Sequence, residues 1–452
     1  MPRLFACLLG LLLAFAPLGS FAREALSGPL AEYVAAKDDS YAWVKRSEGS
    51  VATCKYVELT LTSQTWRGIT WKHQLFIIKP ARTRPDVKHA LLMIAGGSWR
   101  PELADPKTEV KLPGEAILFA AAAEQLQTPV AILLHVPQQP MFDGKREDEI
   151  IALTFRKFMD TGDPNWPLLA PMVKSAVRGM DATQAAVKKE WNLDLETFTI
   201  TGASKRGWTT WLTGAVDERA VAIAPMVIDM LNMSEHMQLQ KASFDGKASE
   251  QINDYEGLDK QIDTPRGLAL RQIVDPWEYR AQLTQPKLVI LGTNDAYWPL
   301  DACNLYWDDL VGEKYLIYVP NNGHGLPDRS RVLAGLNALH QRIITGKPLP
   351  KLNWAYSGDE TGAVLNVSAD LRPSRVRMWT AKSASRDFRQ SEWTATDAAA
   401  KGESFTHGLA TPSEGYAAML GEAVFHEGTE NEFSLSTNVR IVPEIAAAAG
   451  GR

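Results

Sequence analysis

The hydrophobic positions of the chain form short continuous runs, and longer amphipathic stretches separate these runs from one another. Continuous apolar runs are typical of strands that are buried on both faces of a parallel sheet. Amphipathic stretches between them are typical of crossover helices, so the pattern predicts an α/β protein with a mostly parallel sheet. The predicted strands are residues 89–97, 129–137, 198–201, 219–230, 286–292 and 314–320, and the predicted helices are residues 114–127, 148–159, 171–191 and 331–345.

The two ends of the chain differ from this central pattern. Residues 56–62 and 72–78 alternate as strands and predict an antiparallel start to the sheet, while residues 23–55 predict only a covering segment. After residue 345 the pattern changes to short strands separated by turn residues, at a spacing typical of a β-sandwich. The predicted strands of this part are residues 352–356, 363–368, 375–380, 388–393, 416–425 and 433–442.

One stretch, FTITGASKRGWTTWL, predicts a strand, a sharp turn and a helix. Gly202 and Ala203 leave room for a tight backbone, and Gly207 lets the following helix pack close to neighbouring strands. The arrangement is that of a nucleophile elbow, which would expose the hydroxyl of Ser204 above the edge of the sheet. The second glycine follows the serine by three residues instead of two, so this motif needs support from the rest of the chain.

That support comes from the loops after the last two predicted strands of the sheet. Asp295 follows one of these strands and His324 follows the other, and ligands of open α/β sheets bind just past the carboxyl ends of strands. The order serine, aspartate, histidine is the order of a catalytic triad on the α/β-hydrolase fold. We therefore predict Ser204 as the nucleophile, His324 as the general base and Asp295 as its partner. Asp301 is a rival for the acid role, and we prefer Asp295 because it lies closer to its strand end.

Three residues are candidates for the oxyanion hole. Gly97 and Ser98 end a buried strand where this architecture places its second oxyanion donor, although a plain strand-ending turn has the same residues. Lys205 follows the serine directly, and its side chain could add a charged donor. The alternative for Lys205 is a lysine on an exposed helical turn, beside an Arg206 that pairs with a surface carboxylate.

Together these features predict an α/β-hydrolase domain over residues 23–345 and a β-sandwich domain over residues 352–445. The regular pattern stops at about residues 231–285, where Met and aromatic residues stand among charged ones. This is where α/β hydrolases insert a helical lid, and the alternative is an irregular helical excursion that packs on the sheet. For the β-sandwich we favour a packing role over the binding of a carbohydrate or a partner.

Composition and charge narrow the choice of function. The chain of 452 residues has a net charge of -5 and no basic stripe, so we expect no nucleic-acid partner. No metal-ligand spacing appears, and the predicted triad needs no cofactor, so we expect neither a metal nor an organic cofactor. Outside the N-terminal apolar run, Cys54 and Cys303 either form one disulfide or remain two buried thiols.

The first residues predict a targeting signal. Arg3 precedes an apolar run, and Ser20 and Ala22 place small residues where a signal peptidase reads the chain, so we predict residues 1–22 as a cleaved signal peptide. A membrane anchor is the alternative, but the run is short and contains Pro17. We expect a periplasmic or secreted protein without stable membrane insertion after cleavage.

The stretches TGASKRGWTTWL, AIAPMVIDMLNM, LGTNDAYWPLD and VPNNGHGL resemble the PhoPQ-activated pathogenicity-related protein family. The resemblance extends from about Tyr33 into the C-terminal segment, and the three triad positions show no departure from it. It implies an exported α/β-hydrolase-like protein linked to bacterial envelope regulation, with the nucleophile at Ser204.

Two wider similarities concern the substrate. The loop GTNDAYWPLD is similar to that of prolyl-oligopeptidase-type peptidases, which implies peptide bonds. The cation after the serine is similar to that of glucuronoyl esterases, which implies a carbohydrate ester. We predict an exported serine hydrolase acting on a small-molecule, peptide or carbohydrate-ester substrate. The alternative is a secreted binding or signalling protein that keeps a hydrolase scaffold with little turnover.

Overall fold

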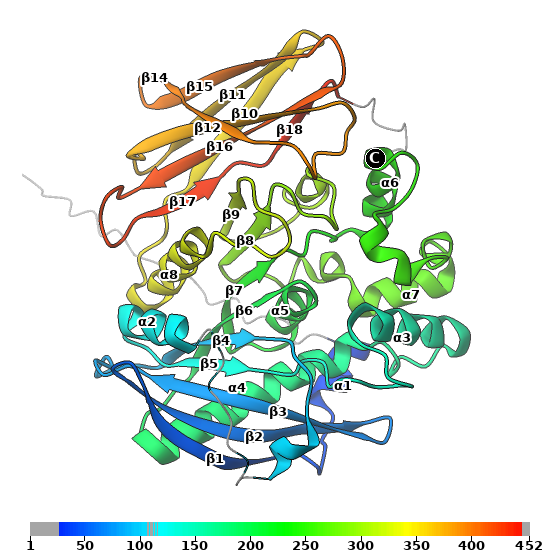
Figure 1. Cartoon of the computed structure of the whole chain (residues 1–452), viewed down its shortest axis with the longest axis vertical. Coiled ribbons are helices and arrows are strands. Elements are labelled where there is room, and N and C mark those ends of the chain that lie inside the picture. The colour runs from blue at the N-terminus through cyan, green and yellow to red at the C-terminus, as the bar shows by residue number, and fades with distance from the viewer. Residues whose placement is uncertain (1–26, 106–107, 109–111, 113, 115, 445–452) are drawn as a thin grey trace, which may run out of the picture.

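The computed structural model of the chain describes residues 27–105, 108, 112, 114 and 116–444, so the predicted signal peptide lies outside the described residues. Its centre is a nine-stranded sheet with the order β1-β2-β3-β5-β4-β6-β7-β8-β9 (Figure 1). The first three strands pair antiparallel, and the six from β5 to β9 run parallel. The strands are β1 (Ala42–Val51), β2 (Cys54–Trp66), β3 (Ile69–Lys79), β4 (His89–Ile94), β5 (Val130–Leu133), β6 (Thr197–Ala203), β7 (Ala220–Met226), β8 (Lys287–Gly292) and β9 (Lys314–Val319).

Helices cover both faces of this sheet, which is why its parallel strands are buried along almost their whole length and are rich in apolar residues. Helices α4 and α5 pack on one face, and α2 and α8 pack on the other (Figure 1). The four predicted helices are confirmed to within a few residues. The helices are α1 (Pro29–Ala35), α2 (Ala116–Leu126), α3 (Glu147–Thr161), α4 (Leu169–Trp191), α5 (Lys205–Val216), α6 (Met233–Ser243), α7 (Pro265–Val274) and α8 (Arg329–Thr345), with short 3-10 turns η1 (Pro101–Ala104), η2 (Glu250–Tyr255), η3 (Asp259–Gln261), η4 (Pro276–Tyr279) and η5 (Ala302–Leu305).

The N-terminal segment is more regular than we predicted. Helix α1 packs on α4, and the long strand β1 pairs with β2 and forms one edge of the sheet. The prediction of a mere covering segment was therefore wrong for this strand. Most residues of β1 are exposed or half-buried, so its sequence lacks the apolar alternation by which a strand is recognised.

The C-terminal part consists of two antiparallel sheets, with orders β10-β11-β15-β14 and β13-β12-β16-β17, and β18 also pairs with β16. They face each other as a sandwich, since a β carbon added to Gly421 on β16 would lie 3.2 Å from the side chains of Leu365 and Val367 on β11. The strands are β10 (Leu352–Asp359), β11 (Gly362–Ala369), β12 (Arg375–Ser383), β13 (Thr394–Asp397), β14 (Ala399–Lys401), β15 (Ser404–Ala410), β16 (Tyr416–Phe425), β17 (Phe433–Ser436) and β18 (Arg440–Val442).

Two of the strand predictions in this part were wrong: residues 388–393 form a turn, and the predicted strand 433–442 is divided into β17 and β18. The strands β13, β14 and β15 were not predicted. The turn differs because its backbone groups bond to side chains of the large sheet's loops instead of to a neighbouring strand. Asn294 donates to the carbonyl of Ser391 at 2.7 Å, and Trp393 donates its N–H to Asn321 at 2.7 Å.

The sandwich shares a hydrophobic core with the large sheet. Buried side chains of β8, β9 and α8 continue without a break into those of β11, β12, β16 and β17. The main-chain N–H of Tyr318 in β9 also donates to the hydroxyl of Ser436 in β17, at 3.0 Å. Since β9 precedes the loop of His324, the sandwich packs directly behind that loop.

The segment between β7 and β8 holds α6, α7 and the turns η2, η3 and η4, which lie beyond the carboxyl ends of the parallel strands (Figure 1). This agrees with the loss of regular pattern at about residues 231–285. We call residues 231–285 the cap segment.

The sequence left open whether Cys54 and Cys303 form a disulfide or remain two buried thiols. Cys54 and Cys303 are both free and buried, so the structure shows two thiols and no disulfide between them. Among the described residues, no helix combines the length and the apolar character needed to cross a membrane.

Candidate active site

Ser204 lies at the turn between β6 and α5, where its backbone adopts φ 58° and ψ -127°. A positive φ is strained for a residue with a side chain, so neighbouring contacts must hold it. The Ser204 N–H donates to the carbonyl of Met226 at 2.8 Å, and the Ser204 carbonyl accepts from the N–H of Trp208 at 2.9 Å. This strained turn has the geometry of a nucleophile elbow.

The two glycines that flank the serine are required by close backbone contacts. A β carbon at Gly202 would lie 2.7 Å from the carbonyl oxygen of Arg206, and one at Gly207 would lie 2.7 Å from that of Met226. Real β carbons are not found at such distances from backbone atoms. The first turn of α5 passes close to the end of β7 at Gly207. This close contact explains why the second glycine of the motif stands three residues after Ser204.

Asp295 and His324 lie on the loops after β8 and β9, as the sequence predicted, and the structure brings them together. Nδ1 of His324 lies 2.9 Å from Oδ2 and 3.0 Å from Oδ1 of Asp295. The carboxylate is buried and also accepts the N–H of Tyr297 at 2.9 Å. A carboxylate accepts from Nδ1–H, so this pair leaves Nε2 as the basic nitrogen of a neutral imidazole.

One face of the His324 imidazole is covered by the side chain of Tyr297, a residue that was not predicted from the sequence. The ring of Tyr297 stacks on that of His324, with 4.1 Å between the centroids and 30° between the planes. Nε2 of His324 is buried and has no hydrogen-bond partner among the described residues. It is therefore not bonded to the Ser204 hydroxyl, a contact that is often long without substrate and tightens when substrate binds.

Asp301, the rival for the acid role, is committed elsewhere. Its carboxylate forms an ion pair with Arg386 of the sandwich. Burial raises the pKa of Asp301, and the charge of Arg386 opposes that rise. Since Asp295 makes the contact with His324, the structure favours Asp295 over Asp301 as the residue that orients the imidazole.

Lys205 and Arg206 are buried and paired with carboxylates, so the alternative of a lysine on an exposed helical turn was wrong. Nζ of Lys205 lies 2.6 Å from Asp148, and the guanidinium of Arg206 donates to both carboxylate oxygens of Glu147 at 2.7 and 2.8 Å. Burial raises the pKa of Glu147, but the Arg206 hydrogen bonds and charge outweigh it and lower the pKa to about 2. The ammonium of Lys205 is thus held by a carboxylate, and the lysine is not on an exposed turn.

Gly97 and Ser98 lie in the loop after β4. Gly97 has φ 110°, and its carbonyl accepts from the amide of Gln139 at 3.0 Å. The hydroxyl of Ser98 accepts from Arg146. Arg206 packs under this loop, because a β carbon at Gly96 would lie 2.5 Å from its guanidinium. The loop is therefore supported by the same arginine that follows the elbow.

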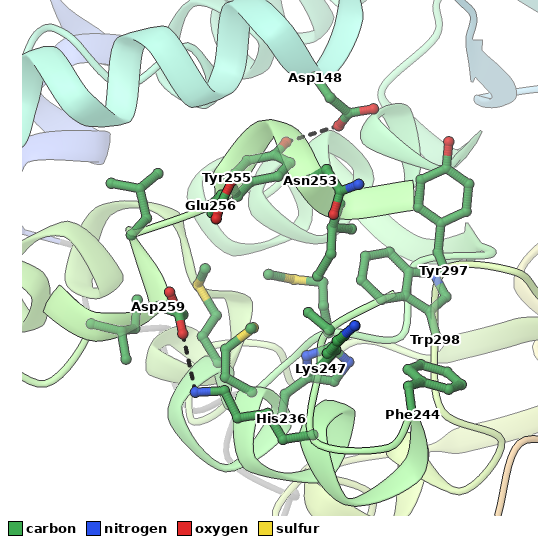
Figure 2. Close-up of a pocket in the computed structure, with 18 of the residues that line it drawn as sticks. Asp148, His236, Phe244, Lys247, Asn253, Tyr255, Glu256, Asp259, Tyr297 and Trp298 are labelled. Carbon is green, nitrogen blue, oxygen red and sulfur yellow. Dashed lines mark hydrogen bonds and ion pairs between the residues drawn. The ribbon is translucent and has the colours of Figure 1, made fainter. Parts of the chain in front are cut away.

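A cavity of about 740 Å³ opens beside Ser204 and extends beneath the cap segment (Figure 2). Tyr255 of the cap segment, Asp148 of α3 and Trp298 after β8 line it together with Ser204 and Lys205. The hydroxyl of Tyr255 donates to Asp148 at 2.8 Å, which ties the cap segment to α3 (Figure 2). Burial and the neighbouring Asp148 raise the pKa of Tyr255 well above its usual value.

Asp148, Tyr297 and Trp298 were not predicted as members of this site, and Tyr255 was predicted only as part of the lid segment. Asp148 belongs to an acidic cluster that is also typical of a solvated helix start, and Tyr255 bonds to it across 107 positions of the chain. Tyr297 and Trp298 directly follow the aspartate loop. Their aromatic character after a strand end was the available signal.

The described residues contain no group of three or more His, Cys, Asp and Glu side chains that could hold a metal ion. The polar groups beside Ser204 are instead paired with one another, as Lys205 is with Asp148 and His324 is with Asp295. What the arrangement offers chemically is a half-buried hydroxyl at a strained turn, together with an imidazole whose Nδ1 is held by a carboxylate.

The strand order, the crossover helices and the elbow at the end of β6 define an α/β-hydrolase fold. The chain belongs to the PhoPQ-activated pathogenicity-related protein family, whose pattern it matches over residues 30–389. It is 32% identical over 398 residues to the autocrine proliferation repressor protein A of Dictyostelium discoideum, which covers 82% of this chain and 78% of that protein.

Solved structures similar to this one include two acetyl xylan esterases. The esterase from Paenibacillus sp. R4 is 13% identical with a TM-score of 0.48, and the match covers 68% of this chain and 91% of that one. The esterase from Thermoanaerobacterium sp. JW/SL YS485 is 14% identical with a TM-score of 0.46, over 69% and 91% of the two chains. The acylaminoacyl peptidase of Pyrococcus horikoshii is 15% identical with a TM-score of 0.37, over 68% and 49%.

Proposed function

We propose that this protein is an exported serine hydrolase that cleaves an ester or peptide bond with Ser204, His324 and Asp295. The observation that carries the proposal is the His324 imidazole: Nδ1 is bonded to Asp295, while Nε2 is buried and finds no hydrogen-bond partner in the part of the chain that the structure describes. An unpaired buried nitrogen costs free energy, so its presence calls for an explanation such as a catalytic role. The strained Ser204 at the end of β6 supplies the group on which it would act.

The chemistry follows from these positions. Ser204 Oγ attacks the carbonyl carbon, and its proton passes to Nε2 of His324 while Asp295 stabilises the imidazolium. The bond to the leaving group then breaks, and His324 returns the proton to the departing oxygen or nitrogen. His324 then takes a proton from a water molecule, which attacks the acyl carbon, and returns that proton to Ser204 Oγ as the bond to the serine breaks. This releases a carboxylic acid and restores Ser204.

For the oxyanion we propose main-chain donors. The N–H of Lys205, the first residue of α5, is placed next to the nucleophile, and a second N–H comes from Gly97 or Ser98. The ammonium of Lys205 is left with a supporting role, since it is bonded to Asp148. The predicted charged donor is thus replaced by a backbone donor in the proposal.

The test is labelling of the purified mature protein with a fluorophosphonate probe. We expect the wild type to be labelled and both Ser204→Ala and His324→Ala to lose the label, while the control Ser234→Ala on α6 keeps it. The absence of label on folded wild type, after prolonged incubation, would contradict the proposal.

The proposal also includes the compartment and the regulation that the family description suggests. Residues 1–22 would direct export to the periplasm or beyond and be removed. We expect N-terminal sequencing of the mature protein to begin at Arg23, and its transcript to rise when PhoPQ is active. An intact N-terminus in the cytoplasm would contradict the export part alone.

A second function is supported by one of the comparisons. The relative from Dictyostelium discoideum is described as an autocrine proliferation repressor, a description that fits a secreted signalling protein on the same scaffold. The two functions differ in their dependence on the nucleophile. If purified Ser204→Ala protein slows the growth of the producing cells as well as wild type does, signalling is the function and turnover is not required.

A further inference from the structure

The cavity beside Ser204 has a lining that is chemically uneven. One part of its wall is made of apolar side chains, and four of them are methionines: Met159 of α3, Met230 between β7 and α6, and Met233 and Met237 of α6. Phe155 and Trp208 complete this wall. Figure 2 shows sulfur atoms among the side chains that line the cavity.

The carboxylates that line the cavity are largely paired within the protein. Asp148 is bonded to Lys205 at 2.6 Å, and Asp259 is paired with Lys241 at 3.0 Å. Glu250 is paired with Arg389 of the sandwich at 2.9 Å. A cationic or highly polar group of a substrate would have to compete with these pairs, whereas an apolar group would meet the apolar part of the wall directly.

We propose that this cavity binds the acyl group of the substrate, and that this group is a medium-length aliphatic chain of an ester. The proposal rests on the proposed function, since it places the scissile carbonyl at Ser204 and the acyl chain beneath the cap segment. The volume lies in the range that holds a drug-sized apolar ligand and exceeds the needs of an acetyl group. Methionine walls suit a flexible chain because unbranched thioethers repack around different shapes.

The step balances without a further reagent. Ser204 Oγ bonds to the acyl carbon, the ester C–O bond breaks, and the alcohol leaves with the proton that His324 carries. Water then cleaves the acyl-enzyme, and the fatty acid leaves the cavity. The alcohol part of the ester stays outside the apolar wall, near exposed charges of both signs such as Lys247 and Glu256.

The first experiment measures kcat/KM for p-nitrophenyl acetate, butyrate, hexanoate and octanoate. Each fully buried methylene adds about fourfold, and octanoate has six more methylenes than acetate, so burial of about half of them gives a rise of at least ~30-fold. Met237→Trp should fill the cavity and lower the octanoate value about tenfold or more while acetate changes little. Leu239→Trp, on the same helix but outside the cavity lining, is the matched control and should keep the wild-type profile.

Failure of this inference is distinguishable from failure of the proposed function. A flat or falling profile in a protein that fluorophosphonate labels at Ser204 would overturn the acyl proposal alone, as would a preference for peptide amides over the octanoyl ester. If the wild type is not labelled, calorimetric titration of octanoate still tests the cavity. Binding that Met237→Trp weakens and Leu239→Trp leaves intact supports the proposal, and the absence of binding overturns it.

Discussion

The elbow and the cap segment lie on opposite sides of the same cavity and are built in opposite ways. Around Ser204 the backbone is fixed by main-chain bonds to β7 and by glycines that admit no side chain. The cap segment consists of two short helices and three 3-10 turns, and its ties to the rest of the molecule include single side-chain pairs such as Tyr255 with Asp148.

The difference separates two tasks. A reacting hydroxyl must be held in position to within a fraction of an ångström, and the carboxyl ends of the central strands supply that rigidity. A binding wall must accommodate a ligand and let it in, so it is better built from elements of low local stability. Substitutions at the sheet edge should therefore act on rate or folding, while substitutions in the cap segment should act on access.

The largest effect should come from the residue that orients the imidazole. We expect Asp295→Asn to lower kcat by ~10⁴-fold, because an amide in place of the carboxylate stabilises the wrong tautomer of His324. Asp301→Asn should keep most of the activity per folded molecule, since Asp301 pairs with Arg386 instead. Kinetics on an ester substrate with circular dichroism as the folding control measure both, and the reverse result would assign the acid role to Asp301.

The next largest effect is a pH dependence of stability that comes from Asp229, a buried carboxyl group in the segment after β7. Burial raises the pKa of Asp229 to about 8, although the hydroxyl of Tyr306 donates to it at 2.8 Å. The native state keeps this proton while the unfolded chain releases it above about pH 4, so the native state loses stability as the pH rises from about 4 to 8.

Asp229→Asn should remove that loss. The free energy of unfolding of the variant relative to wild type should rise with pH by up to ~1.4 kcal/mol per pH unit over this range, as measured by urea unfolding at pH 5, 6, 7 and 8. Taking the difference cancels the opposite effect of buried histidines such as His236, whose pKa burial lowers to about 3. A difference that does not change with pH would show that Asp229 is not protonated in the native state.

A steric test of the elbow should have a smaller effect on folding. Gly207→Ala places a methyl group against the Met226 carbonyl, and we expect a loss of about 1–3 kcal/mol in the free energy of unfolding. The matched change in the cap segment is Gly246→Asn, where φ is 79° and no atom lies within 4 Å of the added carbon. Asn tolerates that conformation, so this variant should unfold within ~0.5 kcal/mol of wild type. Equal losses would remove the distinction between the two regions.

The smallest effect should come from the pair that joins the cap segment to the sandwich. Glu250→Gln removes an exposed ion pair with Arg389, so fluorophosphonate labelling should accelerate by at most ~fivefold as the cap segment opens more often. Glu196→Gln breaks the exposed pair with Lys88 at the far end of the sheet and should leave the labelling rate unchanged. Slower labelling of Glu250→Gln would mean that the pair orders the site instead of closing it.

The sequence predicted the parallel strands of the central sheet well because they are buried on both faces and thus rich in apolar residues. It predicted the loop positions of Ser204, Asp295 and His324 because a strand end followed by glycines and polar residues is a local pattern. The edge strand β1 and the strands β13 and β14 were missed because their residues are largely exposed. Exposure removes the periodicity on which such predictions depend.

The fine geometry of the site depends on contacts between distant segments, which no local pattern encodes. The sequence could not show that Asp148 holds Lys205, since the two lie 57 positions apart. Nor could it show that the ring of Tyr297 stacks on His324. Burial and pairing of this kind exclude the exposed helical turn, which was one of the two readings of Lys205.

The turn of residues 388–393 bonds to Asn294 and Asn321, which stand beside the loops of Asp295 and His324. Ribosomes make a chain from its N-terminus, so the elbow, the aspartate and the histidine all emerge before this turn exists. A nascent chain that has reached residue 345 therefore has the reacting groups without the brace that steadies two of them. We expect such a truncated chain to be inert towards the probe, so that hydrolytic capacity arises only when synthesis is nearly finished.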